Sequence, residues 1–463
     1  MSLPTPVGRQ KEVVCLPARG HQVVLGTAGS GKTTMAILRA AYLAHPVLPE
    51  SGKVLLLTYN KALSGYIRSI SSSHLNNVTV EHYHLFARGY LKANGLMKFG
   101  AIADSGRRRE LISRSVDSVR ATHPPHTFFD RSIGFFDSEV GWLAKNGIDD
   151  IQAYLDVKRI GRGESLAPNL RRIVWAVRSN YLQMRDLAGY SYDWDDIATT
   201  VYSTLKQDVT ARRYKHIVID EGQDLSPEML RSLAHAIPEE GSITFFGDVA
   251  QQIYGHRMSW RSAGLKPPKV WDFSENYRNS KEIAELGLAI ANMPYYQGIT
   301  DMVRPKKPSA AGPRPTIVSF REEEAEIAFV VSQAKKISAT ASVAILVRTL
   351  AQKRLLRPLL PDDTIDLKED TAKWVAGPNI YLGTYHSAKG LEFDHVFLPF
   401  MDEDHFPDPS QVEDFGQDEA DANDGRLLYV GVTRAKTGLV LTHCGTLTHL
   451  LPADQALYAI VKK

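Results

Sequence analysis

The segment GTAGSGKT, residues 26–33, carries the residue types that bind a phosphate chain. It fits the pattern G-x-x-x-x-G-K-T and stands between a short apolar run, Gln22–Leu25, and a helical pattern, MAILRAAYLA. Backbone N–H groups at the glycines can curl around phosphate oxygens, and the following helix adds the positive end of its dipole. Lys32 is expected to reach the β and γ phosphates, and Thr33 to bind Mg²⁺. The alternative is a glycine-rich turn without a ligand. The predicted phosphate-binding residues are Gly26, Thr27, Ala28, Gly29, Ser30, Gly31, Lys32, Thr33 and Thr34.

A second segment, KHIVIDEGQD, provides carboxylates that a metal-bound phosphate chain needs. Asp220 ends an apolar run, where it can hold Mg²⁺ through water, and Glu221 follows as the candidate general base. An Asp-Glu pair after an apolar strand is often only a surface turn, so the phosphate loop is what favours the catalytic interpretation. A carboxylate beside a metal ligand suits activation of water. Hydrolysis is therefore favoured over phosphoryl transfer to an acceptor.

The elements that must position these residues are short strands separated by helical patterns, which predict parallel α/β sheets. Two series of strands are expected. The first includes 22–25, 53–58, 78–81, 215–220 and 243–246, and the second begins at VWDF near Lys269 and continues to 439–442. Helical periodicity without strands from residue 91 to 209 predicts an all-helical insertion. We therefore expect a first domain from 1–90 and 210–268, the insertion at 91–209, and a second domain at 269–463.

Composition narrows the classes of protein. The 463 residues carry a net charge of +3 and include only two cysteines, which is typical of a reducing compartment. The first residues lack an apolar signal region, and no later stretch has the ~18 to 20 apolar residues that span a bilayer, so a cytoplasmic protein without a membrane partner is expected.

The charges are unevenly distributed along the chain. Residues 151–190 contain seven basic and three acidic side chains, so they could lie along a polyanion. Residues 401–425 contain ten acidic side chains and no Lys or Arg, and are expected to form a long loop. An ordinary solvated surface is the alternative for both.

Five segments resemble, in order, the motifs of helicase superfamily one, in its UvrD/Rep-like branch. They are DEGQD, FFGDVAQQIYGHR at 245–257, SENYRNS at 274–280, GTYHSAKGLEFDHVFLP at 383–399 and LLYVGVTRAK at 427–436. The resemblance implies two RecA-like domains with ATP and Mg²⁺ between them. It implies that Gln10 reads the adenine edge, Tyr277 stacks on adenine and Glu392 meets the ribose. It also implies that Gln251 senses the γ-phosphate, and that Arg278 and Arg434 are arginine fingers.

Nucleic-acid contacts are expected on both sheets, because single strands are held by aromatic platforms and by contacts to phosphates. The resemblance places these contacts at Thr58, Asn60, His84, Phe86, Tyr254, Trp260, Thr384 and His386. The alternative is that Phe86, Tyr254 and Trp260 belong to the core.

The chain departs from the family pattern in several places. Thr34 and Met35 follow the phosphate loop where an arginine is common, and Gly425 stands where a basic residue is usual. About 107 residues separate Asn276 from Gly383, too few for the large accessory domain of many relatives.

Two functions follow as hypotheses. The first is a single-stranded DNA translocase and helicase that moves 3′ to 5′, with basic residues between Lys158 and Arg185 facing the strand. The second is an ATPase subunit that regulates a partner such as a nuclease, for example in a phage-defence module resembling the Gabija type, with weak or no unwinding alone.

Overall fold

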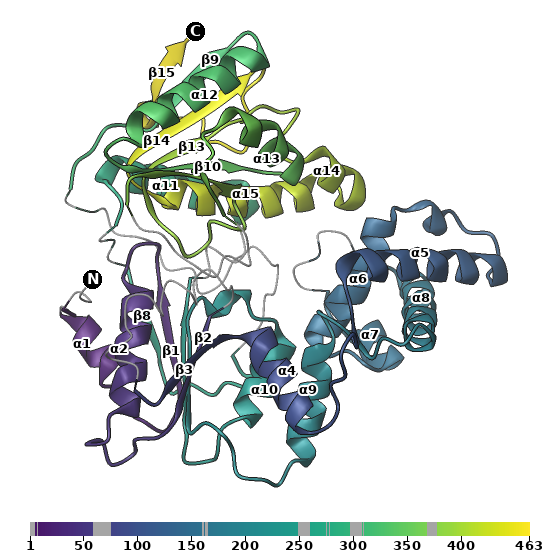
Figure 1. The fold of residues 1–463 in the computed structure, drawn as a ribbon. Coiled ribbons are helices and arrows are strands. Elements are labelled where there is room, and N and C mark those ends of the chain that lie inside the picture. Colours follow the sequence, from purple (N-terminus) through teal and green to yellow (C-terminus); the bar gives the residue numbers. More distant parts are fainter. Residues whose placement is uncertain are drawn as a thin grey trace.

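The structure is a computed structural model with two parallel sheets and a helical block beside the first sheet (Figure 1). It describes residues 5–6, 8–58, 76–159, 162, 165–248, 260–274, 276, 278–296, 308, 310–367 and 377–463. Four predicted site residues, Asn60, Gln251, Tyr254 and Tyr277, lie outside the described residues. No helix in these described ranges has the length and apolar character needed to cross a membrane.

The first sheet has the strand order β3-β2-β6-β7-β1-β8 with all neighbours parallel. Its strands are β1 (Gly20–Gly26), β2 (Val54–Thr58), β3 (Val78–His82), β6 (His216–Ile219), β7 (Ser242–Gly247) and β8 (Val270–Phe273). The central strands are apolar along their length because helices cover both faces. Leu55 and Leu57 pack toward α4 (Tyr83–Ala93), α9 (Ile197–Gln207) and α10 (Pro227–His235). Val54 and Leu56 pack toward α1 (Arg9–Val14) and α2 (Lys32–Ala44).

The second sheet has the order β11-β12-β10-β13-β14-β9-β15. Its strands are β9 (Thr316–Phe320), β10 (Ser342–Val347), β11 (Ile365–Asp366), β12 (Asn379–Thr384), β13 (Phe393–Leu398), β14 (Ala435–Cys444) and β15 (Ala459–Lys462). One face packs on α11 (Lys281–Ala291) and α15 (Gln417–Thr433), the other on α12 (Glu323–Ile337) and α13 (Leu350–Leu356). Short 3₁₀ turns at Pro294–Tyr296, Arg357–Leu359 and Gln455–Leu457 join these elements. The two α/β sheets confirm the predicted fold class.

The helical block lies where the sequence predicts an insertion. It contains α5 (Ser105–Thr122), a 3₁₀ turn (Thr127–Asp130), α6 (Ile133–Asn146), α7 (Ile151–Asp156) and α8 (Pro168–Leu187) around its own apolar core. A two-stranded sheet of β4 (Ile102–Ala103) and β5 (Tyr192–Asp193) joins the chain entering the block to the chain leaving it. The block projects to one side of the first sheet (Figure 1).

Two details of the predicted organisation are wrong. VWDF, expected in the second series, forms β8 and pairs with β1 in the first sheet. An apolar run carries no signal of which sheet it joins, so the crossover had to be placed by guesswork. The acidic stretch is not a long loop, because α14 (Pro409–Phe415) and the first half of α15 lie within it. Asp418 and Glu419 occupy the first turn of α15, where the helix dipole favours negative charge. The domain limits themselves stay predictions.

Candidate nucleotide site between the two sheets

The phosphate loop connects β1 to α2, and glycines shape it. Gly29 and Gly31 have φ angles of 76° and 83°, in the left-handed region that favours glycine. A Cβ atom at Gly26 would lie 2.5 Å from the Ser30 Oγ atom, so a side chain there would close the loop. The buried hydroxyls of Thr27 and Ser30 have no hydrogen-bond partner among the described residues. Such unpaired polar atoms around a cradle of backbone fit a phosphate group.

The Lys32 side chain lies folded over this loop. Its Nζ atom donates hydrogen bonds to the carbonyl oxygens of Gly26, at 2.9 Å, and Thr27, at 2.7 Å. It also lies 3.6 Å from the Asp248 Oδ2 atom. The ammonium group is therefore held at the phosphate loop itself, where it can exchange carbonyl oxygens for phosphate oxygens.

The two carboxylates that follow β6 have different environments. Both Asp220 side-chain oxygens are buried without a hydrogen-bond partner among the described residues. Burial and the neighbouring Glu221 raise the pKa of Asp220 to about 7, although Thr33 and Lys32 oppose the shift. A buried carboxylate without a partner, beside a threonine hydroxyl of the phosphate loop, fits a Mg²⁺ ion.

Glu221 is held differently. Burial would raise its pKa, but the charges of Lys32, Lys389 and Arg434 lower the pKa below its ordinary value. Its backbone has a φ of 53°, which is uncommon and strained for a residue other than glycine. Two of the three cations come from the second sheet. The candidate base is therefore ionised by both halves of the molecule.

Sequence reasoning assigned no role to Gln223 and Asp248, although both stand inside quoted motifs. The Gln223 Nε2 atom donates to Glu221 Oε2 at 2.5 Å, and its Oε1 atom accepts from the backbone N–H of Asp248 at 2.9 Å. Gln223 thus ties the end of β6 to the end of β7. Buried polar residues inside DEGQD and FFGD were the available signal.

The second sheet reaches the phosphate loop through the turn 276–279. A Cβ atom added to Gly29 would clash with Asn276 and lie 2.6 Å from the Arg278 Cβ atom. The Asn276 Oδ1 atom accepts from the backbone N–H groups of Arg278, at 3.0 Å, and Asn279, at 3.2 Å. Asn279 Nδ2 donates in turn to Ala435 O at 2.5 Å. Arg278 therefore lies directly beside the loop and is anchored to the second sheet.

Arg434 is completely buried at the end of α15. Its guanidinium donates to Val430 O at 3.0 Å, Leu391 O at 3.1 Å and Thr433 Oγ1 at 3.2 Å. Burial and then the charge of Arg278 lower its pKa to about 10, against the opposing charges of Glu221 and Asp248. It remains a cation at neutral pH within electrostatic range of the candidate base.

The residues predicted around adenine and ribose have protein partners in this structure. Gln10 Nε2 donates to Ser30 O at 3.2 Å, so it lies against the phosphate loop. Glu392 accepts from Arg278 Nε at 2.7 Å and forms an ion pair with Lys436 at 2.9 Å. Burial opposes these two cations, which lower its pKa to about 2. Thr34 is half-buried on the first turn of α2.

The predicted nucleic-acid residues divide into two groups. Thr58 and Thr384 end β2 and β12, while His84 lies in the first turn of α4 and binds Trp194 O at 3.2 Å. His386 follows β12, and burial with the charges of Arg348 and Lys389 lowers its pKa to about 4. These four lie at the carboxyl ends of strands. Phe86 is only 8% exposed within the core, and Trp260 packs on Phe245 at 5.0 Å, as the core alternative describes.

The expectation that the basic residues of 151–190 face a polyanion is wrong for most of them. Arg159 and Arg162 form ion pairs with the fully buried Glu139 at 2.7 and 2.9 Å. Arg171 donates to three carbonyl oxygens at the end of α7, and Arg185 binds Asp196 at 2.5 Å. Sequence counts charges but cannot show which are paired inside. Lys158 and Arg172 are exposed.

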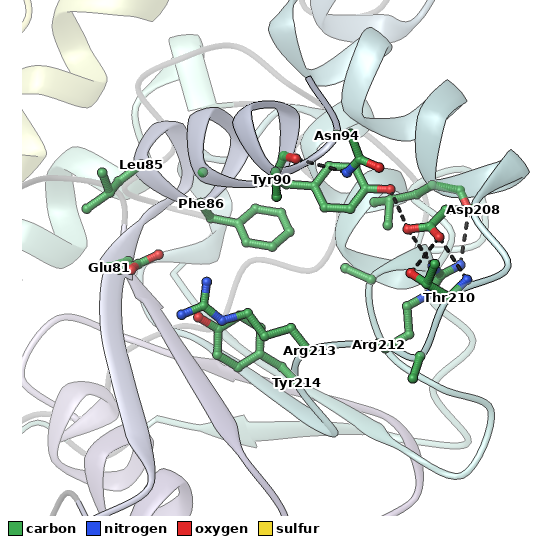
Figure 2. A pocket seen from close by; sticks show the side chains of 15 residues that line it. Glu81, Leu85, Phe86, Tyr90, Asn94, Asp208, Thr210, Arg212, Arg213 and Tyr214 are labelled. Carbon is green, nitrogen blue, oxygen red and sulfur yellow. Dashed lines mark hydrogen bonds and ion pairs between the residues drawn. The ribbon is translucent and has the colours of Figure 1, made fainter. Parts of the chain in front are cut away.

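A separate pocket of about 430 Å³ lies between α4 and the segment 208–214. Figure 2 shows Phe86 and Tyr90 projecting from α4 toward Tyr214 and Arg213. Tyr90 donates to Asp208 Oδ2 at 2.8 Å across one end. Phe86 is the one predicted site residue among those that line it, so this pocket is distinct from the nucleotide site.

A phosphate loop on one parallel sheet, faced by two arginines of another, defines a P-loop protein with two RecA-like lobes. The chain belongs to the UvrD/REP helicase family. The family model for the UvrD/REP helicase N-terminal domain matches residues 7–266, and that for the UvrD-like helicase C-terminal domain matches residues 356–446.

Three curated proteins illustrate the likeness. The ATP-dependent DNA helicase srs2 of Schizosaccharomyces pombe is 26% identical over 326 residues, which cover 64% of this chain and 35% of that protein. The ATP-dependent DNA helicase UvrD2 of Mycobacterium tuberculosis is 22% identical over 562 residues, which cover 94% of this chain and 78% of that protein. DNA helicase IV of Escherichia coli is 23% identical, covering 89% of this chain and 65% of that protein. The chain thus spans about a third of srs2 and larger shares of the other two.

Proposed function

We propose that this chain is an ATP-dependent single-stranded DNA translocase that moves 3′ to 5′ and unwinds duplex ahead of it. The observation that carries the proposal is the position of Arg278 and Arg434. Both belong to the second sheet, yet Arg278 lies against Gly29 of the phosphate loop and Arg434 influences Glu221. A triphosphate held at Lys32 would be contacted from both sheets.

The residues support hydrolysis. Backbone N–H groups of the loop and the Lys32 ammonium would bind the phosphates. Thr33 and Asp220 would hold Mg²⁺, which would supply positive charge to the phosphate oxygens. The ionised Glu221 is suited to accept a proton from water, and its hydrogen bond from Gln223 fixes the carboxylate. Arg278 and Arg434 would stabilise charge that develops on the phosphate, with planar guanidiniums that stay charged.

Movement would follow from the seam between the sheets. Binding of ATP draws the arginines toward the phosphate loop, and hydrolysis releases them. Thr58 and His84 on one sheet, with Thr384 and His386 on the other, would hold the strand in turn. The strand would then advance about one nucleotide per cycle, by resemblance to the family.

One observation favours the second candidate function, a subunit that regulates a partner. Between Asn276 and Gly383 the described residues form α11, β9, α12, β10, α13 and β11, all of which belong to the second sheet and its cover. A large accessory domain is missing from those described segments. A chain of this kind could hydrolyse ATP without unwinding alone.

A strand-displacement assay distinguishes the two. We expect the isolated chain to unwind a duplex with a 3′ single-stranded tail and to leave one with a 5′ tail intact. Unwinding of the 5′-tailed duplex alone would contradict the direction. DNA-stimulated hydrolysis without any displacement would favour the partner-dependent function.

A further inference from the structure

One buried ion pair crosses between the two sheets. Asp224 ends the 3₁₀ turn Gly222–Asp224 after β6, and Lys389 follows β12. The Lys389 Nζ atom donates to Asp224 Oδ1 at 2.5 Å, and the two side chains are 3% and 0% exposed. This contact therefore exists only while the sheets are together.

Such a pair gives little net stability, because removing two charges from water offsets their attraction. Its geometry is nevertheless demanding. The second oxygen, Asp224 Oδ2, has no hydrogen-bond partner among the described residues, so the carboxylate depends on Lys389 for compensation. Burial raises the pKa of Asp224 to about 7, and the charge of Lys389 opposes that shift. The pair thus favours one register of the closed sheets over others.

On the first sheet, the pair adjoins the candidate base. Asp224 is three residues beyond Glu221 in the same tight turn, and its backbone N–H donates to Glu221 O at 3.1 Å. Gln223 lies between them and holds the Glu221 carboxylate. Fixing Asp224 therefore fixes the turn that carries the strained Glu221 backbone.

On the second sheet, the pair adjoins the candidate strand site. The backbone N–H of Ala388 donates to Thr384 O at 3.1 Å, and that of Lys389 donates to His386 O at 3.3 Å. Ser387 Oγ also donates to Thr384 O at 2.9 Å. Thr384, His386 and Lys389 are thus parts of one hydrogen-bonded turn.

We propose that Lys389 and Asp224 are positioning residues that couple strand binding on the second sheet to Glu221 on the first. This inference rests on the proposed function. A strand held at Thr384 and His386 orders the turn that presents Lys389, and Lys389 then fixes the turn that carries the base. Neither residue contacts the reacting atoms in this account.

The test is ATP hydrolysis by the full chain with and without single-stranded DNA. Lys389→Met and Asp224→Asn are each expected to lower the DNA-stimulated kcat about tenfold or more, while the ATP KM changes less than about threefold. Lys389→Arg keeps the charge and should recover most of the stimulation. Lys353→Met is the matched control, since it removes an ion pair of 3.0 Å to Asp366 within the second sheet alone. It should behave as the unmodified chain.

The double variant Asp224→Asn with Lys389→Met leaves no lone buried charge, so it keeps the test valid if a single variant unfolds. Coupling predicts that its stimulation is no lower than that of either single variant. Normal stimulation in Lys389→Met, or additive losses in the double variant, would overturn the inference. Absence of stimulation in the unmodified chain would instead overturn the proposed function.

Discussion

At the scale of single residues, the site consists of charges whose partners come from two sheets. Lys32 rests on its own loop, Asp220 has no partner among the described residues, and Glu221 is ionised by cations from both sides. Arg278 and Glu392 form an ion pair beside the loop. The arrangement suits hydrolysis because each group is already held where charge would develop.

Replacing Glu221 with Gln tests the role of the base. The amide keeps the size and can still hydrogen-bond to Gln223, but it cannot accept a proton. We expect ATP binding to be retained and kcat to fall about 10²-fold or more. Glu239→Gln, at an exposed loop position of the same lobe, is the control. Turnover near that of the unmodified chain would remove Glu221 from the mechanism.

The shifted pKa of Asp220 predicts a pH dependence of stability. Its pKa is about 7 in the folded chain against 3.8 ordinarily, so between these values the folded state holds a proton that the unfolded state has released. Stability therefore falls as pH rises through this window. Asp220→Asn removes the loss, and its Tm in the absence of nucleotide and Mg²⁺ should exceed that of the unmodified chain by about 2 °C or more at pH 8 and by less at pH 5. An equal difference at both pH values would contradict the buried, unpaired carboxylate.

At the scale of elements, the phosphate loop and the strand before Asp220 were predictable because local sequence dictates both. Glycines with left-handed backbone and apolar strands with polar ends leave strong patterns. The sheet that VWDF joins was not predictable, because pairing partners are far apart in sequence. Neither was the internal use of Arg159, Arg162 and Arg185, since ion pairing depends on packing between helices. The roles of Gln223 and Asp224 required the three-dimensional arrangement of two turns.

Glu139 in α6 provides a prediction for the helical insertion. Its buried carboxylate compensates Arg159 and Arg162 and accepts from the Tyr154 hydroxyl at 2.7 Å. Glu139→Gln leaves two arginines without their counterion, so we expect a loss of about 3 kcal/mol in the free energy of unfolding. Denaturant titration measures it. Glu110→Gln, which breaks an exposed pair with Arg107, should cost less than about 0.5 kcal/mol. Similar losses in both variants would contradict a structural role for the insertion's basic residues.

At the scale of the whole molecule, the two sheets meet through three kinds of contact. Gly29 packs against Asn276 and Arg278, Asp224 pairs with Lys389, and α14 lies near α6 through Arg162 and Glu419, 3.7 Å apart. The first two surround the nucleotide site, and the third joins the insertion to the second lobe. A chain joined in this way can convert a change at the phosphates into relative movement of its lobes.

The measurement that tests the central claim most directly is ATP hydrolysis by Arg278→Ala in the presence of single-stranded DNA, with nucleotide binding measured in parallel. Lys436→Ala, which removes the other cation from Glu392, controls for loss of that ion pair. If both sheets complete the site, Arg278→Ala binds ATP through the first sheet but hydrolyses it about 10³-fold more slowly. Hydrolysis by Arg278→Ala at the rate of the unmodified chain would show that the second sheet takes no part in cleavage.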